Sequence, residues 1–271
     1  KTWAKILCSK EFQKKFSSSK EISKLSKEDK NNFEDLFLIT GLNYIYWRDG
    51  IKYEQLFPTV KQEGGTCWAN ACATGIVLAS KRIVGRKELY FYEVRAKLIN
   101  YFKENVEKKE GVDITEALSK VLPEYNLLYE EVKSEDEIIF FNPNGSYNLY
   151  ICAFWLEPEQ WDDFGIFYQQ NKGKNIEEDL NKTKKDPNRK PEGGHAVILL
   201  DMDSSQYILL NSWGLSWGDQ GKFAIERGII PRMKFYKIFW HESDLTIEEK
   251  QCYKKRLEKA TEVFYQILDY I

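Results

Sequence analysis

The stretch that decides the fold runs from Gln62 to Ala69 and reads Gln-Glu-Gly-Gly-Thr-Cys-Trp-Ala. Its paired glycines predict a turn, and the small and apolar residues that follow Cys67 as far as Ala79 predict a buried helix. Cys67 then stands at the helix N-terminus, where unpaired backbone N–H groups and the macrodipole stabilise an anion. The stretch therefore predicts a thiol that ionises readily and can act as a nucleophile.

Two motifs far downstream supply a base and a group to orient it. The apolar runs His195–Leu200 and Gln206–Asn211 flank a short polar segment and predict a β-hairpin. With the turn centred on Asp203, regular antiparallel pairing places His195 directly opposite Asn211, with Cβ atoms about 4.5–5.5 Å apart. At that separation the Asn211 side-chain oxygen can accept a hydrogen bond from the imidazole N–H. The hairpin thus predicts an oriented histidine.

Together these motifs resemble the papain family of cysteine peptidases, in which a Cys-Trp pair is followed far downstream by a histidine and an asparagine. His195 and Asn211 follow Cys67 at close to the family's distance of roughly 130–150 residues. The segment Asn211–Gly221, with its two Trp-Gly pairs, resembles the family's glycine-tryptophan signature. Tyr46–Asp49 is similar to the start of the family's mature chain. The resemblance covers residues 44–242.

The resemblance implies a role for each of these side chains. Cys67 is the expected nucleophile, His195 the general base and acid, and Asn211 the residue that orients His195. Gln62 is the expected oxyanion donor beside the Cys67 N–H group, and Trp213 is expected to shield the His195–Asn211 pair. The implied substrate is a polypeptide in an extended conformation, and the residues predicted to contact it are Gly65, Gly194 and Trp213.

The sequence departs from the family pattern around the nucleophile. Four residues separate Gln62 from Cys67 where the family has five, so the turn is shorter. Gly64 occupies the position of a disulfide cysteine, and the partner motif Cys-x-Gly-Gly, which offers backbone hydrogen bonds to substrate, is missing. Its counterpart is the stretch Lys108–Asp113. Gly194 is expected to widen the pocket floor and to favour a bulky apolar substrate residue.

The hydrophobic pattern along the chain predicts an α+β, papain-like fold with two lobes. Residues 67–135 show helical spacing, with further helices expected at 87–107 and 114–122, and form the helical lobe. Residues 138–243 contain short apolar runs and predict an antiparallel, β-barrel-like lobe. The active-site cleft is expected between the two lobes, where it suits an extended peptide.

Two segments lie outside the expected catalytic domain of residues 43–243. Residues 1–42 predict an N-terminal helical extension or a partial, inhibitory pro-segment. Residues 244–271 begin with a capping box at Thr246 and predict an amphipathic helix, which docks on the enzyme body or binds a protein partner. Within the domain, Asn171–Glu192 is polar and predicts a surface loop.

Composition narrows the function classes. The chain has 271 residues, 42% of them hydrophobic, and a net charge of −2, which is typical of a globular enzyme and shows no nucleic-acid signature. No apolar run approaches the ~20 residues that span a bilayer. Two histidines and no Cys-x-x-Cys argue against a metal site, and no cofactor is expected. Five scattered cysteines without the family's bridge favour the cytoplasm or another reducing compartment over a lysosomal or secreted location.

The motifs together predict a cysteine peptidase that acts through a thioester on Cys67. The same thioester also serves an acyl-transfer enzyme, such as a deamidase, transamidase or isopeptidase, because another carbonyl or another nucleophile can take part. A third interpretation is a binding module with little turnover, which the short spacing after Gln62 and the missing substrate loop favour. The sequence does not separate the peptidase from the other acyl-transfer enzymes, whereas the intact Cys67, His195 and Asn211 argue against the binding module.

Overall fold

The computed structural model describes residues 60–139, 148–156, 158–170, 175–176, 193–229 and 233–255. The chain divides into two compact units. One unit comprises Phe57–Asn142 and Ser146–Thr246, and contains all the elements discussed below. In the other, the described part is the helical stretch 247–255, which begins directly after Thr246 as the capping box predicts. The predicted extension at residues 1–42 and the segment Tyr46–Asp49 lie outside the described residues.

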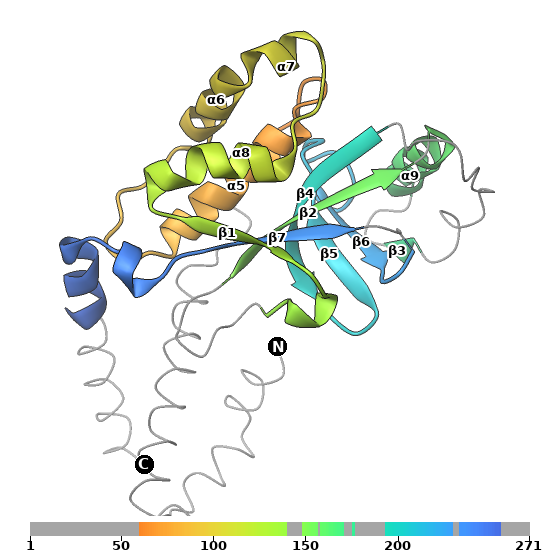
Figure 1. Ribbon diagram of the computed structural model, residues 1–271. Helices are drawn as coiled ribbons and strands as arrows, with labels where there is room; N and C mark the ends of the chain where they lie inside the picture. Colours follow the sequence, from red (N-terminus) through yellow and green to blue (C-terminus); the bar gives the residue numbers. More distant parts are fainter. Residues whose placement is uncertain are drawn as a thin grey trace, which may run out of the picture. The chain divides into compact units, whose positions relative to one another are not determined.

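The helical part of the larger unit consists of consecutive elements from Cys67 to Tyr125 (Figure 1). Its central helix is buried over nearly its whole length, because small residues such as Gly75 let the sheet approach. The helix expected at 87–107 is two helices that are separated at Phe102. The Asp113 carboxylate caps the helix that follows by accepting the Thr115 N–H at 2.8 Å. The elements are α5 (Cys67–Lys81), α6 (Phe91–Tyr101), α7 (Lys103–Glu107), α8 (Ile114–Val121) and the 3₁₀ turn η2 (Leu122–Tyr125).

A seven-stranded sheet forms the other part of this unit, in the order β1-β7-β2-β4-β5-β6-β3. Its neighbours pair antiparallel except β3 and β6, which are parallel. The α+β prediction is confirmed, but the sheet is open and is not closed into a barrel. The strands are β1 (Leu128–Val132), β2 (Leu149–Leu156), β3 (Asn175–Ile176), β4 (Gly193–Met202), β5 (Gln206–Leu210), β6 (Lys222–Glu226) and β7 (Lys234–Phe239).

The two faces of the sheet are covered differently. Helix α5 packs against β2, β4 and β7 on one face. On the other face, helix α9 (Pro158–Gln170) contributes Phe164 and Tyr168 to an aromatic-rich core that also includes Phe154 and Trp217. Figure 1 shows α5 to α8 gathered together and α9 separate from them. The described residues of this unit also include two short 3₁₀ turns, η3 (Glu135–Glu137) and η4 (Glu242–Asp244).

The hairpin of β4 and β5 differs from the regular hairpin expected around Asp203. The Asp203 carboxylate accepts N–H groups of Ser205 and Gln206, at 2.8 and 3.0 Å, so the turn lies later in the chain. Met202 therefore pairs with Tyr207. The predicted direct pairing of His195 with Asn211 is wrong, because the turn is held by this local carboxylate and not by symmetry about Asp203.

A β-bulge brings Asn211 back to the correct face. In the register near the turn, Asn211 would lie opposite Ile198 and point away from the face that His195 shares. The register shifts between Leu199 and Asp201, so Ile198 pairs with Leu210 instead. Continued by one residue, this register places Asn211 diagonally across from His195 on the same face, within reach of its side chain.

Candidate active site

Cys67 is the first residue of α5, as the sequence predicts. The N-cap residue Thr66 makes no side-chain cap bond to the helix, and its hydroxyl donates to the Glu63 carbonyl at 2.8 Å. The first-turn N–H groups are therefore not covered by this side chain. Cys67 is 8% exposed, and its Sγ lies 4.0 Å from the Gly194 carbonyl oxygen.

His195 and Asn211 are hydrogen-bonded to each other. The His195 Nε2 atom lies 2.7 Å from Asn211 Oδ1, and both residues are buried. Because an amide oxygen only accepts hydrogen bonds, this contact assigns the proton of the neutral imidazole to Nε2 and leaves Nδ1 as its basic nitrogen. Asn211 Oδ1 also accepts the N–H of Ser212 at 2.8 Å, which fixes the orientation of the amide.

The Cys67 sulfur lies against the backbone on both sides of His195. The Gly194 carbonyl precedes the histidine, and the Ala196 N–H that follows it lowers the pKa of the thiol. The N–H groups of Trp68 and Cys67 act in the same direction. Burial has the larger effect and raises the pKa of Cys67. Burial also lowers the pKa of His195 to about 4, although the Asn211 hydrogen bond raises it.

Aromatic rings enclose the His195–Asn211 pair. The Trp213 ring centroid lies 5.3 Å from that of His195, and its shielding role stays a prediction. Phe154 and Trp161 lie 5.7 and 5.6 Å away, both edge-on. Sequence reasoning missed Trp161 because it missed helix α9. The spacing of Trp161, Phe164 and Tyr168 is helical and was the available signal.

Gln62 is joined to the residue after Asn211 by two hydrogen bonds. Its backbone N–H donates to the Ser212 carbonyl at 2.7 Å, and its side-chain Oε1 accepts from the Ser212 hydroxyl at 2.6 Å. Its Nε2 donates to the Gly64 carbonyl at 2.8 Å, which leaves one amide hydrogen for another acceptor. Ser212 therefore links Gln62 to Asn211 and His195. The sequence motif contained Ser212, but only the structure reveals this link.

The two glycines predicted to contact substrate are both exposed. A Cβ at Gly65 would lie 3.6 Å from the Lys109 carbonyl oxygen, so the Lys108–Asp113 loop lies beside the nucleophile turn. A Cβ at Gly194 would lie 2.9 Å from the Trp155 Nε1 atom. The absent side chain at Gly194 therefore makes room for an indole, where a wider pocket floor was expected. Substrate contact by Gly65, Gly194 and Trp213 stays a prediction.

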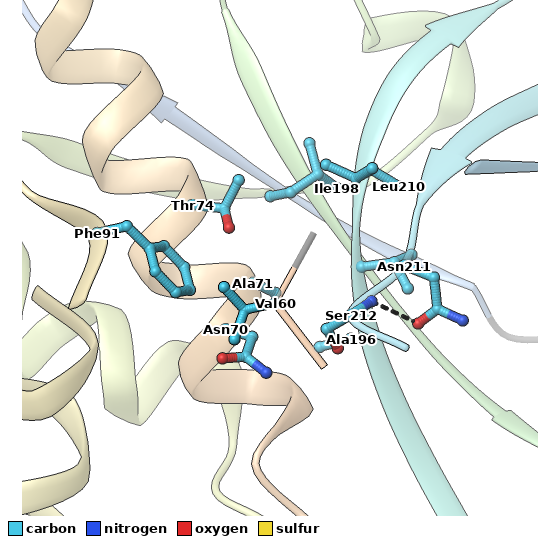
Figure 2. A pocket seen from close by; sticks show the side chains of 11 residues that line it. Val60, Asn70, Ala71, Thr74, Phe91, Ala196, Ile198, Leu210, Asn211 and Ser212 are labelled. Atoms are coloured by element: carbon cyan, nitrogen blue, oxygen red, sulfur yellow. Dashed lines mark hydrogen bonds between the residues drawn. The ribbon is translucent and has the colours of Figure 1, made fainter. Parts of the chain in front are cut away.

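A small pocket lies between α5 and the strands β4 and β5 (Figure 2). It has about 20 Å³ of room for a water-sized molecule. Figure 2 shows Asn70 and Thr74 on the helix side, and Ile198, Leu210 and Asn211 on the strand side. The Asn70 side-chain nitrogen is buried without a hydrogen-bond partner. The complete lining is Val60, Asn70, Ala71, Thr74, Phe91, Ala196, Val197, Ile198, Leu210, Asn211 and Ser212.

The described part of the chain has neither a metal-binding cluster nor a membrane-spanning helix. Within those residues, no cluster of histidine, cysteine, aspartate or glutamate is arranged to hold a metal ion. No helix among them is long and apolar enough to cross a membrane. Cys67, Cys72, Cys152 and Cys252 are free thiols, and Cys8 lies outside the described residues.

Comparison with known proteins gives matches among solved structures. No family model and no curated protein matches the chain. The structure is similar to xylellain, a cysteine protease from Xylella fastidiosa, with a TM-score of 0.45 and 16% identity, covering 68% of this chain and 82% of that chain. It is similar to the Carica candamarcensis cysteine protease CMS1MS2, solved in complex with E-64, with a TM-score of 0.43 and 14% identity, covering 67% of this chain and 93% of that chain.

A third match is a structure from work on the mite allergens Blo t 1 and Der p 1, with a TM-score of 0.40 and 17% identity, covering 66% of each chain. These neighbours are papain-like cysteine proteases. At such identities and scores the likeness carries no argument about activity.

Proposed function

We propose that the protein is a cysteine peptidase that hydrolyses peptide bonds with Cys67 as nucleophile, His195 as general base and acid, and Asn211 as the orienting residue. The observation that carries the proposal is the 2.7 Å contact between His195 Nε2 and Asn211 Oδ1. It leaves the opposite ring nitrogen basic, and the Cys67 sulfur lies against the backbone of Gly194 and Ala196, the residues on either side of His195. A thiol, an oriented imidazole and an amide acceptor are the groups that thiol-dependent acyl transfer requires.

The first step moves a proton from the Cys67 thiol to His195 Nδ1. Burial opposes a lone charge on either group, because it raises the pKa of the thiol and lowers that of the imidazole to about 4. A thiolate and an imidazolium formed together compensate each other in a way that a single buried charge does not. The N–H groups of Ala196 and Trp68 favour the thiolate, and Asn211 favours the imidazolium.

The thiolate then attacks the carbonyl carbon of the peptide bond and forms a tetrahedral intermediate. The Cys67 N–H and the free hydrogen of the Gln62 amide are the proposed oxyanion donors. His195 protonates the departing amine, which leaves a thioester on Cys67. A water molecule deprotonated by His195 hydrolyses the thioester and restores the thiol. An extended polypeptide fits this chemistry, with Gly65 and Gly194, both exposed, as its proposed backbone contacts.

The binding-module interpretation also has an observation in its favour. The Gln62 Nε2 group donates to Gly64 and so keeps a single hydrogen for an oxyanion. Weak oxyanion stabilisation would leave a protein that binds peptides and turns them over slowly. A deamidase, transamidase or isopeptidase would form the same thioester from a different carbonyl or resolve it with a different nucleophile.

Mass-spectrometric profiling of a diverse peptide library tests the proposal. The wild type should cleave library peptides, and Cys67→Ala should cleave none. Cys252→Ala is the matched control, because this cysteine is also a free thiol, is half-buried and is not one of the proposed catalytic residues. Intact peptides together with a stable acyl adduct on Cys67 would instead indicate acyl transfer. Intact peptides without an adduct, from folded protein, would contradict the peptidase proposal and favour the binding module.

A further inference from the structure

Arg95, on helix α6, contacts the first turn of the nucleophile helix at two points. Its Nε donates to Asn70 Oδ1 at 2.6 Å, and its Nη2 donates to Thr66 Oγ1 at 3.4 Å. Asn70 and Thr66 are 3% and 6% exposed, whereas Arg95 is half-buried. Thr66 and Asn70 lie on either side of Cys67 along the chain. The guanidinium therefore spans the turn that carries the sulfur.

The partners of Arg95 are neutral. No carboxylate within the described ranges forms an ion pair with it. A half-buried guanidinium usually pairs with a carboxylate, which matches its fork of donors and compensates its charge. Here the fork binds an amide oxygen and a hydroxyl oxygen instead. The arrangement thus connects α6 to α5 with one cation and no counter-charge at the contact.

The contact with Thr66 has a consequence for the helix N-terminus. A threonine at the N-cap normally accepts the N–H of the second or third helical residue, here Trp68 or Ala69. In this structure the Thr66 hydroxyl donates to the Glu63 carbonyl and receives the Arg95 Nη2, and it makes no cap bond. Its φ and ψ of −97° and 19° also lie outside the extended region usual for a capping residue.

The N–H group that is left uncapped matters to the sulfur. The Trp68 N–H is one of the backbone groups that favour the Cys67 thiolate. A threonine hydroxyl free to cap the helix would compete for this donor. Holding Thr66 away therefore keeps the donor for the sulfur.

We propose that Arg95 is a positioning residue: through Thr66 and Asn70 it holds the first turn of α5 and keeps the Trp68 N–H directed at the Cys67 sulfur. The proposal rests on the proposed function, since it takes Cys67 as the nucleophile. Other charged or titratable groups near this turn are Glu63 on the preceding loop, His195 on β4, and Cys72 on α5, whose thiol interacts with Cys67 and with Asp113 at the start of α8. All of them remain in the variants below, so differences among the variants report on Arg95 and Thr66.

Alkylation of Cys67 by iodoacetamide at a series of pH values tests the proposal, with the modified site identified by peptide mass spectrometry. In Arg95→Met, Thr66 is released and caps the helix, so the pH midpoint of alkylation should rise by about one unit. In Arg95→Met combined with Thr66→Val, the valine cannot accept a hydrogen bond, so most of the rise should disappear. A merely structural role for Arg95 would lower the melting temperature without this reversal.

An unchanged midpoint in Arg95→Met, or an equal rise in the double variant, would overturn the proposal. Arg95→Gln repeats the test should the methionine variant not fold, because glutamine keeps an amide donor for Asn70 while releasing Thr66. The readout needs no peptide cleavage. If the wild type cleaves no peptide but the variants shift the alkylation midpoint as expected, the peptidase proposal is refuted and the role of Arg95 stands. If the wild type cleaves peptides but the variants leave the midpoint unchanged, the role of Arg95 is refuted and the peptidase proposal stands.

Discussion

Replacing Asn211 by alanine removes the acceptor of two hydrogen bonds with one substitution. The His195 Nε2 proton and the Ser212 N–H both lose Asn211 Oδ1, at 2.7 and 2.8 Å. Each buried donor left without a partner costs about 1–3 kcal/mol. If the loss at His195 falls on the charged imidazolium of the reaction, kcat/KM should decrease by about 10–10²-fold. The free energy of unfolding should decrease by about 1–3 kcal/mol through Ser212.

The same substitution has a predicted signature in the pH profile. The Asn211 hydrogen bond raises the pKa of His195, against the larger effect of burial. Its loss should lower the pKa of His195 further. The limb of the kcat/KM profile that is set by ionisation of His195 should therefore move to lower pH. The assay is kcat/KM against pH with a peptide that the library identifies as a substrate.

His195→Ala calibrates the result, because it removes the proposed general base and should cost more, about 10²–10⁴-fold. His241→Ala is its matched control, since His241 is the chain's other histidine, is exposed and precedes the turn η4. The reasoning would be refuted if Asn211→Ala stayed within three-fold of wild type, or if it cost more than His195→Ala.

Three further substitutions test other contacts. Gln62→Ala should lower kcat by about 10²–10³-fold if its amide reaches the oxyanion, whereas a loss of only a few-fold would show that the bond to Gly64 holds the amide away. Asp203→Asn should be less stable than wild type at neutral pH and equally stable at low pH. Hydrogen bonds from Ser205 lower the pKa of Asp203 from 3.8 to about 2, so the contribution of the carboxylate to stability is present above pH 3.8 and is lost as the pH falls to about 2. Acid titrations of the two proteins should therefore converge, and a constant difference would contradict the turn. Gly218→Ala should destabilise the fold by about 2–4 kcal/mol in thermal unfolding, because its φ is +58° and a Cβ would collide with the Lys222 carbonyl. Gly228→Ala is the control, because Gly228 has a φ of +84° and an added Cβ would meet no neighbour within 4 Å. If the two variants lose equal stability, the structure has relieved the collision at Gly218.

The sequence was sufficient where a local pattern determines a local structure. The run of small and apolar residues after Cys67 predicts α5 because such residues let a helix bury nearly its whole surface close to the sheet. It was insufficient at α9, whose acidic and aromatic residues show no strand alternation and follow directly on β2. The Pro158 that begins this helix and the spacing of Trp161, Phe164 and Tyr168 were the signals. The roles of Ser212 and Arg95 depend on contacts between distant segments, which single-sequence patterns do not encode.

The contact between His195 and Asn211 was predicted by a register that proved wrong, and parity explains why the contact still forms. The expected register and the observed distal register differ by two residues, and a shift of two leaves every side chain on its original face. The register at the turn differs from the expected one by an odd number and would have separated the two side chains. The irregularity at Leu200 shifts the register by one residue, so the difference from the expected register becomes even before the strands reach the site. The Asp203 turn thus sets the register of β4 and β5 at one end of the hairpin, and the bulge changes it to the register that places His195 and Asn211 on the same face.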